Sequence, residues 1–324
     1  MEKILITGCA GYIGSVLTQQ LLNKGYNVRG VDCLMFGGES LISVIGHPNF
    51  EFIKGDLRNE FIIEKCLNGI ESVVHLAAIV GDPACAQQPE VAEEINGKVS
   101  KILFDYSIKS NSVKRFIFSS TCSNYGKMKG DNFVTETSEL NPVSLYARLK
   151  VGFEKYLLES DYRKDLCATA LRFSTVYGIS PRMRFDLTVN EFIKDATLGR
   201  ELKIFGEQFW RPYCHVVDLA RACVLILESE TAKVNREVFN VGDSSQNYQK
   251  KMLANEVLKV IPNAKISFVQ SNEDPRDYRV DFSKITNQLN YGITRTVPDG
   301  IMEIHRTIRD GIISDPDSAR YKNT

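Results

Sequence analysis

The sequence of 324 residues has few of the residues that build metal centres and disulfide scaffolds. It contains four His and eight Cys, and no two Cys are spaced as Cys-x-x-Cys. Structural zinc sites and redox-active disulfides depend on such spacings. We therefore expect no metal site, and we interpret the cysteines as the reduced thiols of a cytoplasmic protein.

The chain also lacks net charge and long hydrophobic runs. Lys and Arg together number 40, and so do Asp and Glu. This balance provides no general field that would attract nucleic acid or an anionic membrane, so a local site must hold any anion. No apolar run approaches the length of about 20 residues that a membrane span needs, and we expect no signal peptide, because the first residues lack the pattern of one. We expect neither nucleic acid nor membrane as a partner.

Strand-like and helical patterns alternate in the first half of the chain. Helical stretches separate most of the apolar runs, and this alternation predicts an α/β fold with a parallel, doubly wound Rossmann sheet over residues 1–176. The apolar runs that predict strands lie at residues 3–7, 26–31, 50–53, 72–76, 115–119 and 168–173.

The pattern loosens after residue 176. We interpret residues 177–314 as a smaller C-terminal α/β lobe, with some chain crossing back to the sheet, and residues 315–324 as a polar tail that frays. Helical patterns near residues 187–198, 217–228, 249–260 and 298–309 alternate with apolar runs at 203–205, 238–241 and 265–269.

A glycine-rich turn follows the first predicted strand and opens a helix over residues 12–23. Gly8 allows the tight turn, Gly11 lets the backbone approach a pyrophosphate, and Gly14 lets helix and strand pack closely. The free N–H groups of the helix N-terminus favour phosphates. A phosphate bound there would contact the first helical residues, Tyr12 and Ile13. The turn therefore predicts a dinucleotide site.

Asp32 ends the second predicted strand and selects among dinucleotides. Its carboxylate suits the ribose hydroxyls and repels a 2′-phosphate, and no Arg follows it, so NAD is favoured over NADP. Asp56, with Leu57, either reaches the adenine or caps the helix over residues 59–67. The end of the fourth strand would let the cofactor lie close to the backbone, through its residues Leu76, Ala77 and Ala78.

Tyr146 and Lys150 have the i, i+4 spacing that places both on one face of a helix. A phenol is a poor base at neutral pH, but a nearby ammonium and a nicotinamide cation would lower its pKa. Tyr146 could then take a proton from a sugar hydroxyl as hydride leaves the same carbon, and Lys150 could also hold the nicotinamide ribose. Taken alone, the spacing is more typical of an exposed helical pair.

Residues 116–126 run from an apolar strand into a loop rich in hydroxyls, which includes Thr121. The loop lies at the carboxyl edge of the predicted sheet, where ligands of open α/β folds bind. A hydroxyl there either bonds the reacting oxygen and relays its proton, or merely satisfies the loop backbone.

Together these motifs resemble the extended short-chain dehydrogenase/reductase family, specifically its NAD-dependent nucleotide-sugar epimerases and dehydratases. The resemblance covers nearly the whole chain. The motifs stand in order as Thr7-Gly8-xx-Gly11-xx-Gly14, Asp32, Asp56-Leu57, His75-Leu76-Ala77-Ala78, Ser119-Ser120-Thr121, Tyr146-xxx-Lys150 and Arg211-Pro212-Tyr213-Cys214-His215-Val216-Val217-Asp218.

The resemblance implies a catalytic set of Thr121, Tyr146 and Lys150 and a C-terminal lobe that binds a nucleotide-diphospho-sugar. It also implies a homodimer. Arg211 and Arg276 match the family's diphosphate ligands, although either could be a surface arginine. His215 and Asp218 are expected to cap and orient their segment.

Two departures from the family pattern are informative. Dehydratases of the family place Asp-Glu after the catalytic Thr, whereas Cys122 and Ser123 stand here. Elimination of water then lacks an obvious acid and base, although both residues would still contact substrate. The Asn that many members carry after the sixth strand is replaced, and the hydroxyl of Thr175 is its expected substitute.

Residues 80–85 and 178–187 resemble a subgroup of bacterial sugar-nucleotide oxidoreductases that includes GDP-heptose C4 dehydrogenases. Arg182 and Arg184 in the second stretch would contact phosphate or base, or be solvated. The resulting hypothesis is hydride removal from C4 of a nucleotide-sugar, which ends as epimerisation or as net dehydrogenation. Dehydration and non-catalytic NAD binding are less favoured, and the sequence leaves the base, the sugar and the fate of the keto sugar open.

Overall fold

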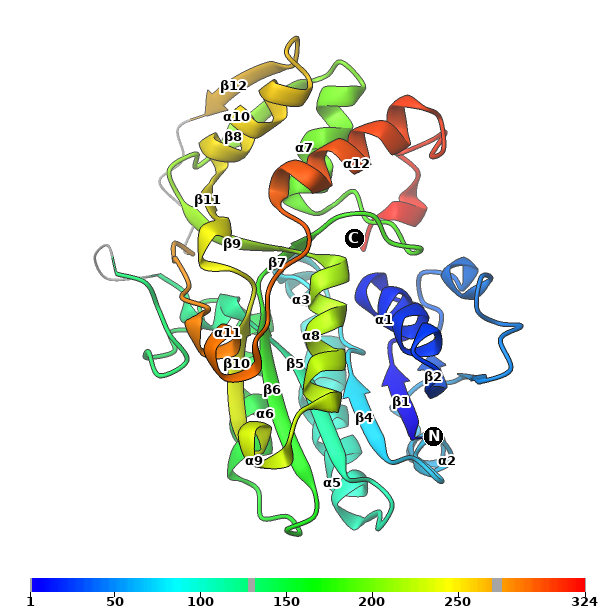
Figure 1. Ribbon diagram of the computed structural model, residues 1–324. Coiled ribbons are helices and arrows are strands. Elements are labelled where there is room, and N and C mark those ends of the chain that lie inside the picture. The colour runs from blue at the N-terminus through cyan, green and yellow to red at the C-terminus, as the bar shows by residue number, and fades with distance from the viewer. Residues whose placement is uncertain (1, 128–131, 270–275, 324) are drawn as a thin grey trace.

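The computed structural model describes residues 2–127, 132–269 and 276–323, and a seven-stranded parallel sheet lies at its centre (Figure 1). The strand order β10-β6-β5-β4-β1-β2-β3 reverses beside β1, as in doubly wound sheets, which confirms the predicted Rossmann fold. The strands are β1 (Lys3–Thr7), β2 (Asn27–Asp32), β3 (Phe50–Lys54), β4 (Ser72–His75), β5 (Arg115–Thr121), β6 (Cys167–Phe173) and β10 (Glu237–Val241).

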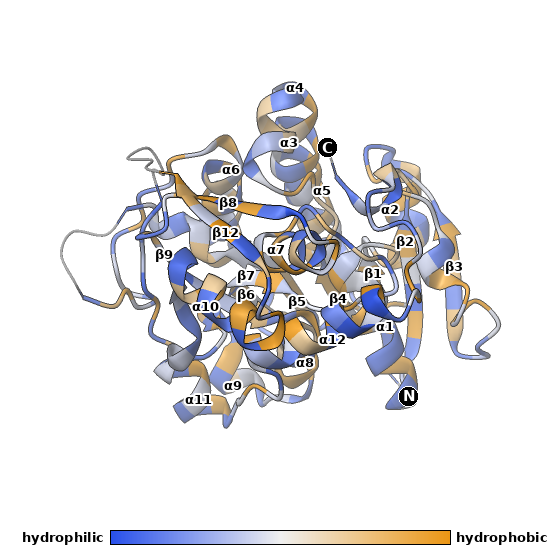
Figure 2. Cartoon of the chain, turned by 90° about the horizontal axis from the view of Figure 1, so that it is seen from above, coloured by the Kyte–Doolittle hydropathy of each residue, from blue (hydrophilic) through white to orange (hydrophobic). Residues whose placement is uncertain are grey.

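Helices cover both faces of the sheet and bury two separate apolar clusters. Helices α1 (Tyr12–Asn23) and α8 (Val216–Glu228) pack together on one face. The other face is covered by α2 (Glu60–Leu67), α5 (Ser100–Lys109) and α6 (Leu145–Glu159). In Figure 2 the hydrophobic colour gathers on α8 and the strands beside it, as expected of a parallel sheet buried on both faces.

The helix starts explain two local features of the sequence. Ser144 caps α6, because its hydroxyl accepts the backbone N–H of Ala147 at 3.2 Å. Helix α2 is capped by Asn59, whose side chain accepts from Phe61 N at 3.0 Å. The interpretation of Asp56 as the cap is therefore wrong, since a better placed Asn side chain takes that role.

The C-terminal lobe lies above the carboxyl edge of the sheet and contains two small sheets (Figure 1). One pairs β8 (Glu201–Phe205) with β12 (Lys265–Val269), next to α7 (Thr188–Thr197), α10 (Lys250–Val260) and α12 (Val297–Arg309). The other, with the order β11-β9-β7, was not predicted because its short strands carry no clear alternation. It consists of β7 (Thr175–Tyr177), β9 (Trp210–His215) and β11 (Asn247–Gln249).

Shorter helical segments connect these elements. They are α3 (Asp82–Gln87), α4 (Pro89–Ala92), α9 (Thr231–Val234) and α11 (Ser283–Leu289), and a π-helical segment, Glu93–Val99, leads into α5. Within the described part of the chain, no helix has both the length and the apolar character of a membrane span.

The polar tail is docked rather than frayed over its described residues. The Tyr321 carbonyl accepts from Phe185 N at 2.9 Å, and the two aromatic rings lie 5.5 Å apart. The next two residues are also bonded, because Arg182 donates to Lys322 O at 3.0 Å and Asn323 N donates to Asp186 at 3.0 Å. The expectation of fraying is wrong because these partners come from a distant loop.

Candidate active site

A cavity of about 380 Å³ opens at the carboxyl edge of the sheet, between the sheet loops and the C-terminal lobe. It brings together nearly all of the site residues predicted from the sequence. The predicted residues that line it are Gly8, Gly11, Tyr12, Ile13, Gly14, Asp32, Asp56, Leu57, Leu76, Ala77, Ala78, Thr121, Ser123, Tyr146, Lys150, Thr175, Arg182, Arg184 and Arg276.

The glycine turn has the shape that a bound pyrophosphate requires. Gly8 has φ +75, and a Cβ at this position would lie 2.9 Å from Ala77 N. A Cβ on Gly14 would lie 2.0 Å from Gly8 O, so no larger residue fits. Helix α1 begins directly after this turn, which leaves its first N–H groups facing the cavity. The turn therefore fits a dinucleotide.

Asp32 lies at the end of β2 with one hydrogen bond on each carboxylate oxygen. Ala10 N donates at 3.1 Å and Leu34 N at 2.8 Å, which holds the side chain at the cavity wall. Burial raises the pKa of Asp32, and these two hydrogen bonds oppose that shift. Each oxygen keeps lone-pair capacity for a ribose hydroxyl. Asp56 is engaged elsewhere, because Arg58 donates to it at 2.6 Å.

Tyr12 lines the cavity, and its side chain connects the glycine turn to the loop after β7. Its hydroxyl donates to Gly178 O and accepts from Asn190 at 3.0 Å. His75 stands beneath the glycine turn, where Nδ1 shares a hydrogen bond with the Thr7 hydroxyl at 2.7 Å. Burial lowers the pKa of His75 to about 3, so the ring is neutral and acts as a spacer.

Tyr146 and Lys150 both reach the cavity from helix α6. Lys150 Nζ lies 5.8 Å from the Tyr146 ring centroid and donates to Ser119 O at 2.8 Å. Thr121 ends β5 at the same wall, and its hydroxyl accepts from Ser123 N at 3.1 Å. The structure thus places the three residues of the predicted catalytic set around one space.

Burial dominates the electrostatics of this set. It lowers the pKa of Lys150 to about 7 and raises the pKa of Tyr146. The nearby groups Cys85 and Asp82 raise the pKa of Tyr146 further. In the protein alone, the ammonium therefore does not produce the lowered Tyr146 pKa that the spacing predicts, because desolvation of the phenolate outweighs it.

The arginines at the cavity are bonded to acceptors of the protein. Arg184 forms a bidentate ion pair with Asp186, with hydrogen bonds of 2.9 and 2.8 Å, and Arg276 donates to Asp82 at 2.8 Å. The Arg182 guanidinium stacks 4.8 Å from the centroid of the Phe36 ring, and the residue is 6% exposed. Burial and the neighbouring Arg184 lower the pKa of Arg182 to about 10, which leaves it charged at neutral pH.

Two predicted substrate contacts do not line the cavity. Cys122 is fully buried, and its thiol donates to Arg172 O at 3.2 Å. Arg211 lies behind the Tyr278 ring, 5.2 Å from its centroid, and donates to Trp210 O. Both side chains are engaged by other parts of the protein, whereas Ser123 and Thr175 face the cavity as expected.

Other residues at the wall were not singled out in the sequence. Met35 and Phe36 come from the loop after β2, Arg58 follows Asp56-Leu57, and Asn323 comes from the tail. Of these four residues, Arg58 alone could have been predicted from a local pattern, because it directly follows the Asp56-Leu57 motif. The rest arrive through contacts between distant segments, which no local pattern records.

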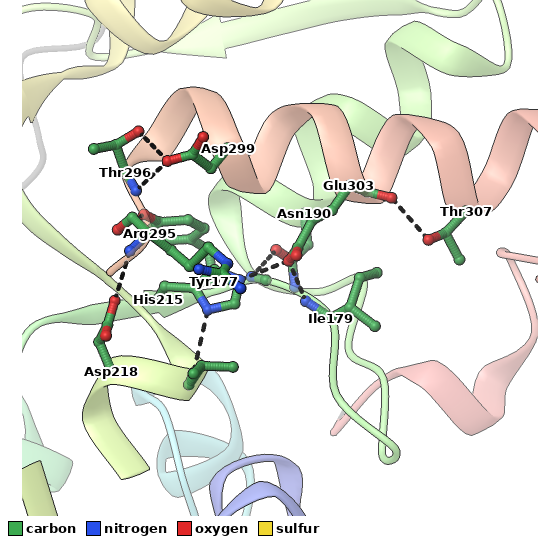
Figure 3. Close-up of polar contacts among 12 residues, drawn as sticks. Tyr177, Ile179, Asn190, His215, Asp218, Arg295, Thr296, Asp299, Glu303 and Thr307 are labelled. Atoms are coloured by element: carbon green, nitrogen blue, oxygen red, sulfur yellow. Dashed lines mark hydrogen bonds and ion pairs between the residues drawn. The ribbon is translucent and has the colours of Figure 1, made fainter. Parts of the chain in front are cut away.

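A group of hydrogen-bonded polar side chains beneath α12 connects the C-terminal lobe to α8 (Figure 3). The His215 ring accepts from Val217 N at the start of α8 and bonds Glu303 at 2.6 Å. Glu303 also accepts from Ile179 N at 2.8 Å, next to the loop that carries the cavity arginines. His215 thus caps its own helix as predicted, whereas Asp218 accepts from the backbone N–H groups of Thr294 and Arg295 and so orients the distant segment before α12.

The doubly wound sheet, the glycine turn and the Tyr–Lys pair at one sheet edge define an α/β enzyme that uses a dinucleotide. The chain matches the model of the NAD dependent epimerase/dehydratase family over residues 4–242, and it belongs to this family. NAD is accordingly its cofactor.

Relatives with different reactions are equally similar to the chain. An uncharacterized UDP-glucose epimerase of Bacillus subtilis is 29% identical over 313 residues, covering 92% of this chain and 95% of that protein. A dTDP-glucose 4,6-dehydratase of Actinoplanes sp. is 29% identical over 316 residues, covering 93% and 96%. The crystal structure of UDP-glucose 4-epimerase with UDP-glucose from Thermotoga maritima superposes with a TM-score of 0.84 and 28% identity, covering 96% and 99%.

Proposed function

We propose that this enzyme oxidises C4 of a nucleotide-diphospho-sugar, with Tyr146 as the base. The observation that carries the proposal is the Tyr146–Lys150 pair, which lines the same cavity as Thr121 and the glycine turn. The names of the similar epimerase and dehydratase support a nucleotide-sugar as the substrate class.

NAD supplies a hydride acceptor and a cationic ring when it is bound. Tyr146 takes the proton of the O4 hydroxyl as the C4–H bond breaks, so that the carbon becomes a ketone. Burial raises the pKa of Tyr146, so its phenolate needs positive charge nearby, and Lys150 provides one such charge.

Thr121 orients the reacting hydroxyl from the end of β5. Its own hydroxyl accepts the Ser123 N–H, which leaves its proton free to point into the cavity. A hydrogen bond from Thr121 to O4 would hold this oxygen at the Tyr146 phenol and relay its proton.

The carboxylates at the cavity argue against dehydration. Among the described residues that line it, Asp32 and Asp56 carry carboxylates; Asp32 ends β2 and Asp56 follows β3, whereas Thr121 ends β5. Where dehydratases place Asp-Glu, Cys122 is buried and Ser123 offers only a hydroxyl. Elimination of water therefore has no acid–base pair beside Thr121.

The ketone is either reduced again on its other face, which makes the enzyme an epimerase, or released, which makes it a dehydrogenase. We favour epimerisation and keep net oxidation of a GDP-sugar or GDP-heptose as the alternative, because of the sequence around Arg182 and Arg184. Retention of NAD through purification would support the first outcome, and exchangeable NAD the second. A homodimer is part of this proposal, and its mass in solution tests it.

The decisive experiment compares Tyr146→Phe with the wild type on UDP-glucose, GDP-mannose, CDP-glucose and dTDP-glucose at saturating NAD. We expect the variant to lose turnover by about 10²–10⁴-fold while it keeps its bound NAD. Tyr156→Phe is the matched control, because this second tyrosine of α6 bonds Asp105 away from the cavity.

Wild-type turnover in Tyr146→Phe would contradict the mechanism. Failure of the wild type to convert any of the four sugar nucleotides would contradict the proposed activity and favour a non-catalytic NAD-binding protein.

A further inference from the structure

A buried ion pair lies one helical turn beyond Lys150. Glu154 of α6 and Arg172 of β6 are 2% and 4% exposed, and the carboxylate bonds the guanidinium at 2.6 Å. Tyr146, Lys150 and Glu154 follow one another at i, i+4 and i+8, so all three lie on the same face of α6. This pair is not part of the cavity wall, and the proposed mechanism does not use it.

Glu154 also binds the strand that carries Thr121. Ser120 donates its hydroxyl proton to Glu154 Oε2 at 2.6 Å, and Asn124 Nδ2 donates to the Ser120 hydroxyl at 3.1 Å. One turn earlier on α6, Lys150 Nζ donates to the carbonyl of Ser119 at 2.8 Å. Helix α6 is therefore hydrogen-bonded to two consecutive residues of β5, immediately before the proposed catalytic threonine.

Arg172 anchors the other side of the pair in the sheet. It donates to the Tyr125 hydroxyl at 2.9 Å, and Tyr125 donates in turn to Asn240 of β10 at 2.7 Å. Ser120 and Arg172 are opposite each other in the β5–β6 register. The carboxylate thus joins a helix to three adjacent strands, β5, β6 and β10.

Stability alone does not account for such an arrangement. Removing two charges from water costs several kcal/mol per ion, and well-packed apolar residues of similar volume often stabilise a core equally well. What a buried, fully bonded ion pair adds is a defined geometry, since its hydrogen bonds hold at fewer relative positions than apolar contacts do. That geometry is needed where α6 meets β5.

We propose that Glu154 is a positioning residue that sets the spacing between the Thr121 hydroxyl and the Tyr146 phenol through its hydrogen bond to Ser120. This inference rests on the proposed function, because it assumes that Thr121 and Tyr146 act on the same oxygen. Ser120 and Thr121 both line the cavity, and the Ser120 hydroxyl is held by Glu154 of α6. A shift of Ser120 by about 1 Å is transmitted to Thr121, and displacements of this size cost up to about 100-fold in rate.

The test compares Ser120→Ala with Ser107→Ala. Each variant removes one hydroxyl from a buried serine, but the hydroxyl of Ser107 in α5 donates to Leu103 O, at 2.8 Å, within its own helix. The measurements are kcat per bound NAD, KM for the best substrate of the four sugar nucleotides, NAD affinity, and hydrogen exchange over residues 119–126.

We expect Ser120→Ala to lower kcat per bound NAD about tenfold, with KM and NAD affinity unchanged, and to speed exchange over residues 119–126. Ser107→Ala should match the wild type in all four. Glu154→Gln should lower kcat per bound NAD by up to about 100-fold. If Glu154→Gln does not fold, Ser120→Ala still decides the matter, because it leaves the ion pair in place.

A purely structural role would reduce the amount of folded enzyme but not kcat per bound NAD. Equal kcat per bound NAD in Ser120→Ala, Ser107→Ala and the wild type, with Tyr146→Phe inactive, overturns the positioning role alone. Full activity of Tyr146→Phe, or no turnover of any sugar nucleotide by the wild type, overturns the proposed function and this inference with it.

Discussion

The two ends of the cavity are built in different ways. At the dinucleotide end, backbone groups form the wall: a turn whose glycines admit no Cβ and a helix start, with Asp32 held by two N–H donors. At the sugar end, long side chains form it, and Arg184 and Arg276 are bonded to protein carboxylates. The first end is complete before a ligand arrives, whereas at the second, the proposed sugar end, a phosphate would have to compete with Asp186 and Asp82 for the arginines.

This contrast explains why similarity identifies the cofactor more readily than the substrate. A backbone cradle depends on a few glycines that any related chain must keep, so one cofactor serves the family. Arginine positions depend on loops and on their acidic partners, which can change without harm to the fold. Relatives that share 29% of residues with this chain accordingly carry the names of an epimerase and a dehydratase.

The largest effect is expected from Lys150→Met, at the junction of the two ends. Turnover should fall by about 10²–10⁴-fold, as for loss of a group that supports proton transfer. The fold should become more stable at pH 6, because burial lowers the pKa of Lys150 to about 7 and the folded protein then holds a buried ammonium.

The sign follows from linkage. The folded-state pKa lies below the unfolded value, so the destabilisation by Lys150 is complete below pH 7 and disappears as the pH rises towards 10.5. Urea unfolding of both proteins at pH 6 and pH 10 measures this difference. A stability gain that is equal at the two pH values would contradict the lowered pKa.

Gly14→Ala tests the dinucleotide end. The added Cβ would lie 2.0 Å from Gly8 O, so the turn must open, and we expect NAD affinity to fall by about 100-fold, the equivalent of about 3 kcal/mol of overpacking. Gly152→Ala is the control, because no neighbouring atom lies within 4 Å of a Cβ at this position. This substitution should stabilise helix α6 by up to about 1 kcal/mol, since Ala has the higher helix propensity. Titration of NAD into both variants gives the comparison, and equal affinities would show that the turn tolerates a side chain.

Asp32→Ala tests the choice of cofactor. Loss of hydrogen bonds between the carboxylate and the ribose should weaken NAD binding about tenfold. NADP binding should improve, because the carboxylate no longer repels the 2′-phosphate. Measured affinities for both cofactors give the ratio, and an unchanged ratio would mean that Asp32 does not contact the ribose.

The smallest effect is expected at the sugar end, from Arg184→Gln. Because Arg184 is already paired with Asp186, its net contribution to substrate binding should be about 1 kcal/mol, which is about a fivefold rise in KM. Arg200→Gln is the matched control, since Arg200 also pairs with an aspartate, Asp317, but does not line the cavity. An equal rise in KM for both variants would show that Arg184 does not contact the substrate.

The sequence was informative wherever a residue acts on its near neighbours. The glycine turn, the strand that ends in Asp32 and the Tyr146–Lys150 spacing are all local patterns, and all three lie at the predicted edge of the sheet. The helices of the C-terminal lobe were also found, because their apolar periodicity is local.

What escaped prediction depends on contacts between distant segments. The tail docks because Lys322 O and Asn323 N meet a loop far away in the chain, at Arg182 and Asp186. Strands β7 and β11 have three residues each, too few for a pattern, and the longer β9, which pairs with both, shows no clear alternation. Cys122 is withdrawn from the cavity by the packing of β5 against β6.

By itself, then, the sequence determined the sheet and the NAD turn and singled out the proposed proton-transfer residues, because each of these needs particular residue types at short spacings. Only the tertiary structure decided how those residues work together. It lowered the pKa of Lys150 by burial, paired Arg184 with Asp186, and set Glu154 against Ser120. Burial and pairing depend on every segment that packs around a group, and these segments meet only in the folded chain.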